Sequence, residues 1–131
     1  ELDGLQGCPN VLLIGATNGP SALDAGILRA GRLGLHLEIG LPDAAGRLAI
    51  LQVHNSDRPL EAVDLADWAT RTDGWNGADL ALLSNQAALE AVREYRAKGM
   101  ADSSQIRIVS HHWEQAHRAI LSQRSSVANR G

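Results

Sequence analysis

The stretch GWNGADLALLSNQAALEAVREYRAKG, residues 74–99, decides the fold class of this chain. Its apolar residues recur every three or four positions, the spacing of one helix face, at Leu80, Leu83, Ala87 and Ala91. Gly99 follows, where glycine commonly ends a helix because it readily adopts a left-handed backbone. The stretch therefore predicts an amphipathic helix from about Gly77 to Lys98.

Shorter helices are predicted on both sides of this one. Asp43 is placed to cap a helix that runs to about His54. Asp64 is placed to cap a short helix that ends at the turn at 72–74. A loop at 100–105 and a short extended stretch at 106–109 lead to a last helix, capped by Ser110. Residues 122–131 are expected to form a flexible tail. The chain after Pro42 is thus predicted to hold four helices.

The residues before Pro42 follow a different pattern. Residues 11–16, VLLIGA, form a continuous apolar run, as expected for a strand of a parallel sheet buried on both faces. Residues 35–41 alternate between apolar and polar, which predicts a second strand, with a short helix at 21–29 between the two. The predicted fold class is therefore mainly α, with a partial α/β segment, the end of a parallel sheet, at 1–42 and a helical domain at 43–121.

Composition excludes several classes of protein. The 131 residues carry a net charge of −3 with a single lysine, Lys98, which argues against nucleic-acid binding. The longest apolar run is too short to cross a membrane. The lone Cys8 suits a reducing compartment, so a cytoplasmic location is expected. Because the chain starts with Glu1 and has no basic or apolar leader, we expect it to be a segment of a longer protein.

Three polar residues near the predicted strands are candidates for phosphate chemistry. Asn18 follows the first predicted strand, where ligands of open α/β sheets bind, although Asn-Gly-Pro is also an ordinary turn. Arg29 and Arg32 flank Gly31, and their guanidinium groups are suited to gripping phosphate or to remaining a solvated pair. The chain has no phosphate loop of the form G-x-x-x-x-G-K-[ST], so any nucleotide would be held mainly by residues elsewhere.

The histidines of the last predicted helix do not indicate a metal site. His112 and His117 are five residues apart and should point to different faces of that helix, with His111 diverging from both. No Ser-His-Asp arrangement carries a recognisable nucleophile motif either. The sequence therefore predicts neither a metal ion nor serine-hydrolase chemistry.

Taken together, several motifs form a family pattern. They stand in order at residues 15–20 (GATNGP), 28–32 (LRAGR), 41–43 (LPD) and 74–80 (GWNGADL), with Leu23-Asp24, Arg47, Ile50-Leu51, His54 and Ala87-Ala88 between and after them. Over about residues 1–120 the chain resembles the second half of an AAA ATPase module. The Gly-Ala-Asp at 77–79 is similar to the sequence found at this place in one branch of the family. That branch contains the valosin-containing-protein or cell-division-cycle type, the proteasomal ATPases and the membrane metalloproteases.

The resemblance implies a role for each candidate residue. Asn18 matches the sensor 1 position, which orients the attacking water, and Arg29 and Arg32 match paired arginine fingers that reach the neighbouring subunit's nucleotide. His54 matches a lid histidine beside the adenine and ribose. Gly77 and Ala78 match the small residues that let the lid backbone approach the base. The implied fold is the end of the large nucleotide-binding subdomain followed by a four-helix lid.

The resemblance also implies cofactors and partners. ATP and Mg²⁺ would be bound mainly by parent residues outside this chain, identical subunits would form a hexamer, and the substrate would be a polypeptide, with no nucleic acid or membrane bound. The sequence departs from the family pattern at Gly34, which affects the expected contacts between subunits. It also departs at His112-Trp113, at the start of the last helix. The main hypothesis is therefore a fragment of an ATPase that couples ATP hydrolysis to protein remodelling. Two alternatives to it stay open: a helical interaction module without catalysis, and the ATPase segment of a membrane metalloprotease.

Overall fold

A computed structural model describes residues 10–17 and 35–130 of the chain. The chain divides into two units, residues 1–40 and 41–131, and the helices among the described residues all belong to the second. The described part of the first unit, 10–17 and 35–40, contains no strand. Side chains such as Leu12, Ile14 and Leu37 are exposed there. The two predicted strands are therefore not formed, because a strand buried on both faces needs neighbouring strands to pair with. The helix expected at 21–29 lies outside the described residues.

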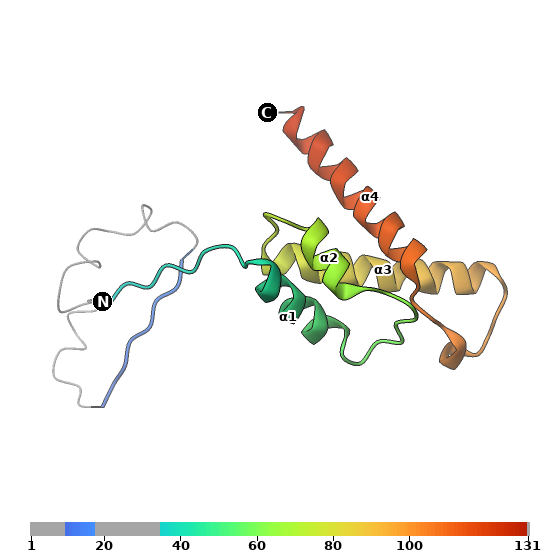
Figure 1. The fold of residues 1–131 in the computed structure, drawn as a ribbon, viewed down its shortest axis with the longest axis horizontal. Coiled ribbons are helices and arrows are strands. Elements are labelled where there is room, and N and C mark those ends of the chain that lie inside the picture. The colour runs from blue at the N-terminus through green and yellow to red at the C-terminus, as the bar shows by residue number, and fades with distance from the viewer. Residues whose placement is uncertain (1–9, 18–34, 131) are drawn as a thin grey trace. The chain divides into compact units, whose positions relative to one another are not determined.

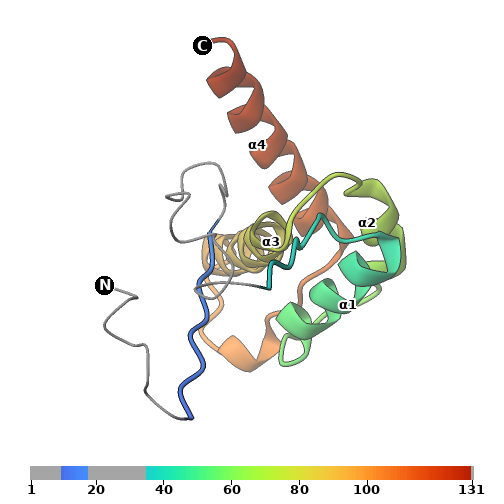
Figure 2. The ribbon, with the colours of Figure 1, turned by 90° about the vertical axis from the view of Figure 1, so that its left-hand side faces the viewer.

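The second unit is helical, as the sequence predicts (Figure 1). Its elements are α1 (Ala44–Asn55), α2 (Leu65–Arg71), α3 (Gly77–Ala97), the short 3-10 helix η3 (Ser103–Gln105) and α4 (Ser110–Ala128). Helix α3 is central, since α1 packs on its first half and α4 also packs on it, while α2 packs on α1. Figure 2 looks nearly along α3, with α1 and α2 on one side of it. None of the described helices is long and apolar enough to span a bilayer.

Side-chain caps set where three of the helices begin. An Asp43 carboxylate oxygen accepts a hydrogen bond from the backbone N–H of Gly46 at 2.7 Å, and Asp64 caps α2 through Ala66 and Asp67. At α3, Asn76 and Asp79 accept from each other's backbone N–H groups, at 2.8 and 3.2 Å. Both predicted aspartate caps are confirmed. Gly99 has φ +70°, so the predicted glycine stop is confirmed as well.

The core forms where α1 and α4 meet the apolar face of α3, and Trp68 and Ala69 of α2 belong to the same cluster. All four predicted face residues of α3 are buried, together with Leu51, Trp68, Trp113 and Ile120. Trp68 and Trp113 bring α2 and α4 together, with ring centroids 5.5 Å apart. Arg71 adds a paired contact, since its two terminal nitrogens lie 2.6 and 2.9 Å from the two carboxylate oxygens of Glu114. Tryptophan rings thus supply the bulk that a core without phenylalanine needs.

Helix α4 differs from the prediction at both ends. Its N-cap residue is Val109, whose N–H donates to Nδ1 of His112 at 3.1 Å, while the predicted cap, Ser110, instead donates from Oγ to the carbonyl of Ala62 at 3.1 Å. The imidazole in the first turn accepts the N–H of Val109, one of the N–H groups that the start of a helix leaves without an intrahelical partner. At the other end α4 runs to Ala128, beyond the predicted end near Leu121. The segment expected to be a flexible tail is therefore helical over 122–128.

Candidate functional site

The structure describes only part of the candidate site. Asn18, Arg29 and Arg32, the residues predicted to face phosphate, lie outside the described residues. His54 lies in the last turn of α1, and Gly77 and Ala78 open α3. The described site is therefore the surface formed by α1 and the start of α3, here called the α1–α3 surface.

Two contacts fix how α1 lies along α3. A Cβ placed on Gly77 would come 4.0 Å from the Cδ1 atom of Ile50, and the side-chain amide of Asn55 donates to the Ser84 hydroxyl at 3.0 Å. Asn55 and Ser84 are both buried. His54 is one helical turn after Ile50 and adjacent to Asn55, so it lies on the part of α1 that these contacts hold against α3. Its side chain is exposed. The structure thus brings the three predicted lid residues to one pair of packed helices.

The start of α3 is open. Among the described residues, nothing lies closer than 4.0 Å to the position of a Cβ on Gly77, and no left-handed φ requires glycine there. Ala78, the next residue, is small and exposed. Neither packing nor backbone conformation within the described unit accounts for Gly77, and the α3 backbone is left accessible to a ligand.

A charged residue that the sequence analysis did not single out lies beside this start. Arg124 of α4 pairs with Asp79 at 2.6 Å, and its guanidinium carbon lies 4.3 Å from the centroid of the Trp75 ring. The second half of α4 is thereby tied to the first turn of α3. The sequence pattern carried no signal for Arg124, because the last helix was expected to end before it.

Arg47 supports the same surface from within the fold. It is buried, its Nε donates to the carbonyl of Ala69 at 2.7 Å, and Nη1 donates to the carbonyl of Pro42 at 3.0 Å. The exposed Asp73 carboxylate lies 3.4 Å from Nη1. One guanidinium thus joins the segment before α1 to the end of α2, which fixes the direction in which α1 leaves Pro42.

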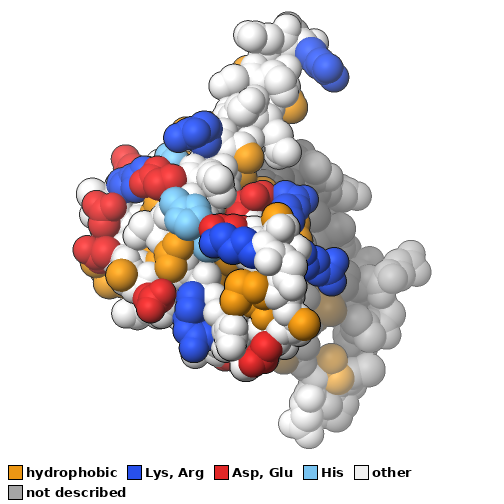
Figure 3. Space-filling model, turned by 90° about the vertical axis from the view of Figure 1, so that its right-hand side faces the viewer, with side chains coloured by type: hydrophobic (Ala, Val, Ile, Leu, Met, Phe, Trp, Pro, Cys, Tyr) orange, Lys and Arg blue, Asp and Glu red, His pale blue; other side chains and the backbone are white. Residues whose placement is uncertain are grey.

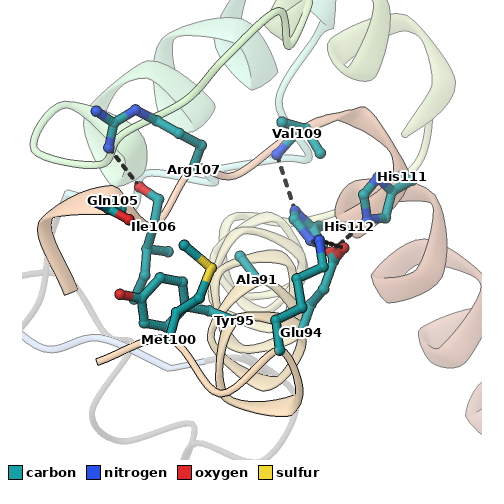
Figure 4. Close-up of a pocket in the computed structure, with 11 residues that line it drawn as sticks. Ala91, Glu94, Tyr95, Met100, Gln105, Ile106, Arg107, Val109, His111 and His112 are labelled. Atoms are coloured by element: carbon teal, nitrogen blue, oxygen red, sulfur yellow. Dashed lines mark hydrogen bonds and ion pairs between the residues drawn. The ribbon is translucent and has the colours of Figure 1, made fainter. Parts of the chain in front are cut away.

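A second cluster of titratable side chains lies at the other end of α3. His111 and His112 of α4 both direct Nε2 to the same carboxylate oxygen of Glu94 (Figure 4). The distance from Nε2 of His111 to that oxygen is 2.7 Å. The other oxygen of Glu94 accepts from Nζ of Lys98 at 2.7 Å. The bond from Lys98, followed by those from the two histidines, lowers the pKa of Glu94 to about 2. Figure 3 shows histidine among acidic and basic side chains on this side of the molecule.

This convergence corrects the sequence analysis, which expected His111 to diverge from His112. Cα–Cβ bonds of a helix tilt toward its N-terminus. In the first turn of α4 both imidazoles can therefore reach back to α3, where Glu94 lies between them. The sequence carried no signal for this contact, because Glu94 and His112 are separated by a turn and by η3.

Comparison with known proteins finds a family whose model matches part of the helical unit. The model of the AAA+ lid domain matches residues 62–106. The chain is 49% identical over 94 residues to the ATP-dependent zinc metalloprotease FtsH 1 of Thermomicrobium roseum, an alignment that covers 71% of this chain and 14% of that protein. It is 48% identical over 99 residues to FtsH 3 of Symbiobacterium thermophilum, covering 75% and 16%. It is also 46% identical over 99 residues to FtsH of Staphylococcus haemolyticus, covering 75% and 14%.

The chain thus spans about a seventh of the length of the curated relatives that it matches. The matched stretch 62–106 contains α2, α3 and η3, and includes Gly77 and Ala78. The resemblance on which these residues were singled out is therefore confirmed at the level of the AAA ATPase superfamily. The chain contains an AAA+ lid domain.

Proposed function

We propose that this chain is the lid-bearing part of a protein that hydrolyses ATP and uses the energy to remodel other proteins. The observation that carries the proposal is the match of the AAA+ lid domain to residues 62–106, within a unit whose helices are packed as one core. Relatives that are 46–49% identical are named ATP-dependent, which supports the same assignment. The lid would transmit the state of the nucleotide to the rest of the machine.

In this proposal the α1–α3 surface borders the nucleotide. His54 would lie beside the adenine and ribose, and Gly77 and Ala78 would let the α3 backbone approach the base. The open first turn of α3 fits that use, because nothing within the described unit accounts for a glycine there. ATP and Mg²⁺ would be held mainly by a phosphate loop and acidic residues elsewhere in the parent protein.

The residues outside the described part would act on phosphate. Asn18 would orient the hydrolytic water, and Arg29 and Arg32 would reach the nucleotide of an identical neighbouring subunit in a hexamer. A guanidinium there stabilises charge that develops in the transition state, which is worth about 10³–10⁵ in rate in nucleoside triphosphatases. The location would be cytoplasmic, the substrate a polypeptide, and neither nucleic acid nor a membrane would be bound by this segment.

Arginine substitutions in the full-length protein test the proposal. Arg29→Ala with Arg32→Ala should lower ATP turnover far more than ATP affinity, since the groups act in the transition state. Lysine should rescue poorly because it lacks the planar fork of donors. Arg93→Ala is the matched control, because Arg93 is exposed and pairs with Glu90 on its own helix. Unchanged turnover in the double variant would contradict the proposal.

Subunit mixing separates action across an interface from action within one subunit. Subunits with both arginines replaced should regain activity when mixed with subunits that lack the phosphate-loop lysine, since some interfaces then join an intact finger to an intact site. A mixture no more active than its two components would contradict action in trans.

A second candidate is the ATPase segment of a zinc metalloprotease, and the names of the relatives favour it. The two candidates share the lid and the arginine fingers, and they differ in whether the protein that is unfolded is also cleaved by the same chain. An H-E-x-x-H motif in the full-length sequence, with proteolysis abolished by a chelator, would decide for the metalloprotease. If the full-length protein failed to bind ATP, the helical interaction module would be the better account.

A further inference from the structure

One side-chain cluster has a composition that the lid fold does not explain. Glu94 on α3 and His111 and His112 on α4 each offer one ligand atom, and these atoms all lie within 4.8 Å of one another. His112 is buried, Glu94 is partly buried and His111 is exposed. Figure 4 shows both imidazoles directed at the carboxylate from the start of α4. The three groups thus converge from two helices on one point near the surface.

We propose that Glu94, His111 and His112 form a binding site for one divalent transition-metal ion, of which Zn²⁺ is the best match. Two imidazoles and one carboxylate are donors that Zn²⁺ accepts in proteins, whereas Mg²⁺ and Ca²⁺ prefer oxygen ligands alone. Around a tetrahedral zinc ion the ligand atoms lie about 3.3 Å apart. Nε2 of His111 lies 2.7 Å from the Glu94 carboxylate, and all the ligand atoms lie within 4.8 Å of one another, so small side-chain movements would complete the site.

The proposed site leaves one coordination position open. Three protein ligands bind the ion, and water would take the fourth position, which is the usual arrangement when a zinc site is not closed by protein. The cluster borders a surface cavity whose lining includes Tyr95, Met100 and Ile106 (Figure 4). The partial exposure of Glu94 and His111 gives the ion a path into the site.

Metal binding would have to disrupt two neighbouring interactions, and each disruption can be measured. Lys98 pairs with Glu94, and its positive charge repels a cation, but its side chain is exposed and can move away. Nδ1 of His112 accepts a hydrogen bond from the N–H of Val109, so the proton of the neutral ring is on Nε2. A metal at Nε2 would move that proton to Nδ1 and break the bond to Val109. Metal binding would therefore be reported by a change of His112 tautomer.

The ion would join α3 to α4 at the end opposite the Arg124–Asp79 pair. Helix α4 would then be attached to α3 at both places, by a metal bridge near His112 and by an ion pair near Asp79. An ion bound by the folded chain and not by the unfolded chain raises the melting temperature as its concentration increases. The proposed role is thus a metal bridge that holds the two helices together.

Zinc titration of the whole 131-residue chain tests the site. A Cys8→Ser background keeps the single thiol from competing for the ion. Zn²⁺ should bind with one-to-one stoichiometry in competition with a chromophoric chelator, raise the melting temperature, and move the ¹⁵N signals of His112 to the Nδ1–H tautomer. His111→Gln should weaken binding by at least about tenfold, since loss of even an outer-shell partner costs about 10- to 100-fold.

Two further variants distinguish specific binding at the cluster from nonspecific binding of zinc by exposed histidines. His54→Gln removes a histidine outside the cluster and should leave the affinity unchanged. Lys98→Gln should tighten binding, because it removes the repelling cation. Absence of zinc binding, equal affinity in His111→Gln and the parent chain, or weaker binding in Lys98→Gln would each overturn the proposal. These measurements do not depend on ATP, so they succeed or fail independently of the proposed function.

Discussion

The imidazole of His117 stacks on the indole of Trp75, with ring centroids 5.5 Å apart and planes inclined by 28°. The same imidazole meets the ring of Trp68 edge-on, with centroids 5.4 Å apart. One histidine of α4 thus lies between the tryptophan of α2 and the tryptophan that precedes α3. Burial among these rings is the main cause that lowers the pKa of His117, and the positive charge of Arg71 adds to it, while Glu114 opposes it.

A lowered histidine pKa makes the stability of the lid depend on pH. Below about pH 6.5 the unfolded chain binds a proton at this histidine more readily than the folded chain does. The contribution of neutral His117 is therefore present above that pH and is lost as the pH falls toward the folded-state pKa. We expect the free energy of unfolding to decrease from pH 7 to pH 5, measured by urea denaturation.

His117→Gln should make this decrease smaller, because the titrating group is gone. His54→Gln is the matched control, since His54 is exposed on α1, and it should leave the pH dependence as in the parent chain. An equal pH dependence in His117→Gln and the parent chain would contradict the assignment.

Arg47 should be among the most sensitive polar residues of the fold. Arg47→Ala removes the donor to the buried carbonyl of Ala69 and the donor to Pro42. A buried carbonyl left without a partner costs about 1–3 kcal/mol, so we expect a loss of roughly 2–3 kcal/mol in the free energy of unfolding. Arg47→Lys should recover only part of it, because one ammonium cannot reproduce the two directions of the guanidinium.

Arg93→Ala serves as the control for this measurement. Arg93 is exposed and pairs with Glu90 at 2.6 Å on the same helix, and such pairs contribute about 0.3–0.5 kcal/mol. Chemical denaturation of the three variants under one condition gives the comparison. Equal destabilisation by Arg47→Ala and Arg93→Ala would show that the buried contacts are not important for the fold.

The helical unit should fold without the residues that precede it. Residues 41–131 contain every helix among the described residues and the whole buried core. We expect this piece to show the helical circular dichroism and the cooperative melting of the full chain. A piece that is unfolded on its own, while the full chain melts cooperatively, would place the domain boundary elsewhere.

The isolated chain should not hydrolyse ATP. Its sequence lacks a phosphate loop, so the phosphates have no cradle of backbone N–H groups and lysine within these 131 residues. We expect phosphate release by the purified chain to equal that of the buffer. Steady turnover that survives further purification, and that Ala78→Leu alters, would refute this expectation.

Local signals predicted most of the helical unit. Asp43, Asp64 and Gly99 act through contacts within a few residues, so their types and positions were enough to predict three helix boundaries. The start of α4 was misplaced by one residue because an imidazole, which is not a usual cap, accepts the bond from Val109. A residue that caps unusually is recognised only from its geometry.

Contacts between distant segments were not predictable in the same way. Glu94 and His111 are 17 residues apart, and nothing in the spacing says that α4 starts beside the end of α3. The same holds for Arg124 and Asp79. The strand predicted at 11–16 was wrong for a different reason. Its pattern is that of a strand in a parallel sheet, and no other strand of such a sheet is present among the described residues. Periodicity indicates which faces are buried but not which partners cover them.

The central claim, that the start of α3 borders a nucleotide, has one direct test. Ala78 is exposed at the second position of α3, so Ala78→Leu should leave the fold intact. Ala66→Leu, at the exposed second position of α2, is the matched control. In the full-length protein we expect Ala78→Leu to weaken equilibrium ATP binding by at least about tenfold, equivalent to roughly 1.4 kcal/mol, and Ala66→Leu to leave it unchanged. ATP affinity in Ala78→Leu equal to that of the unaltered protein would contradict the account.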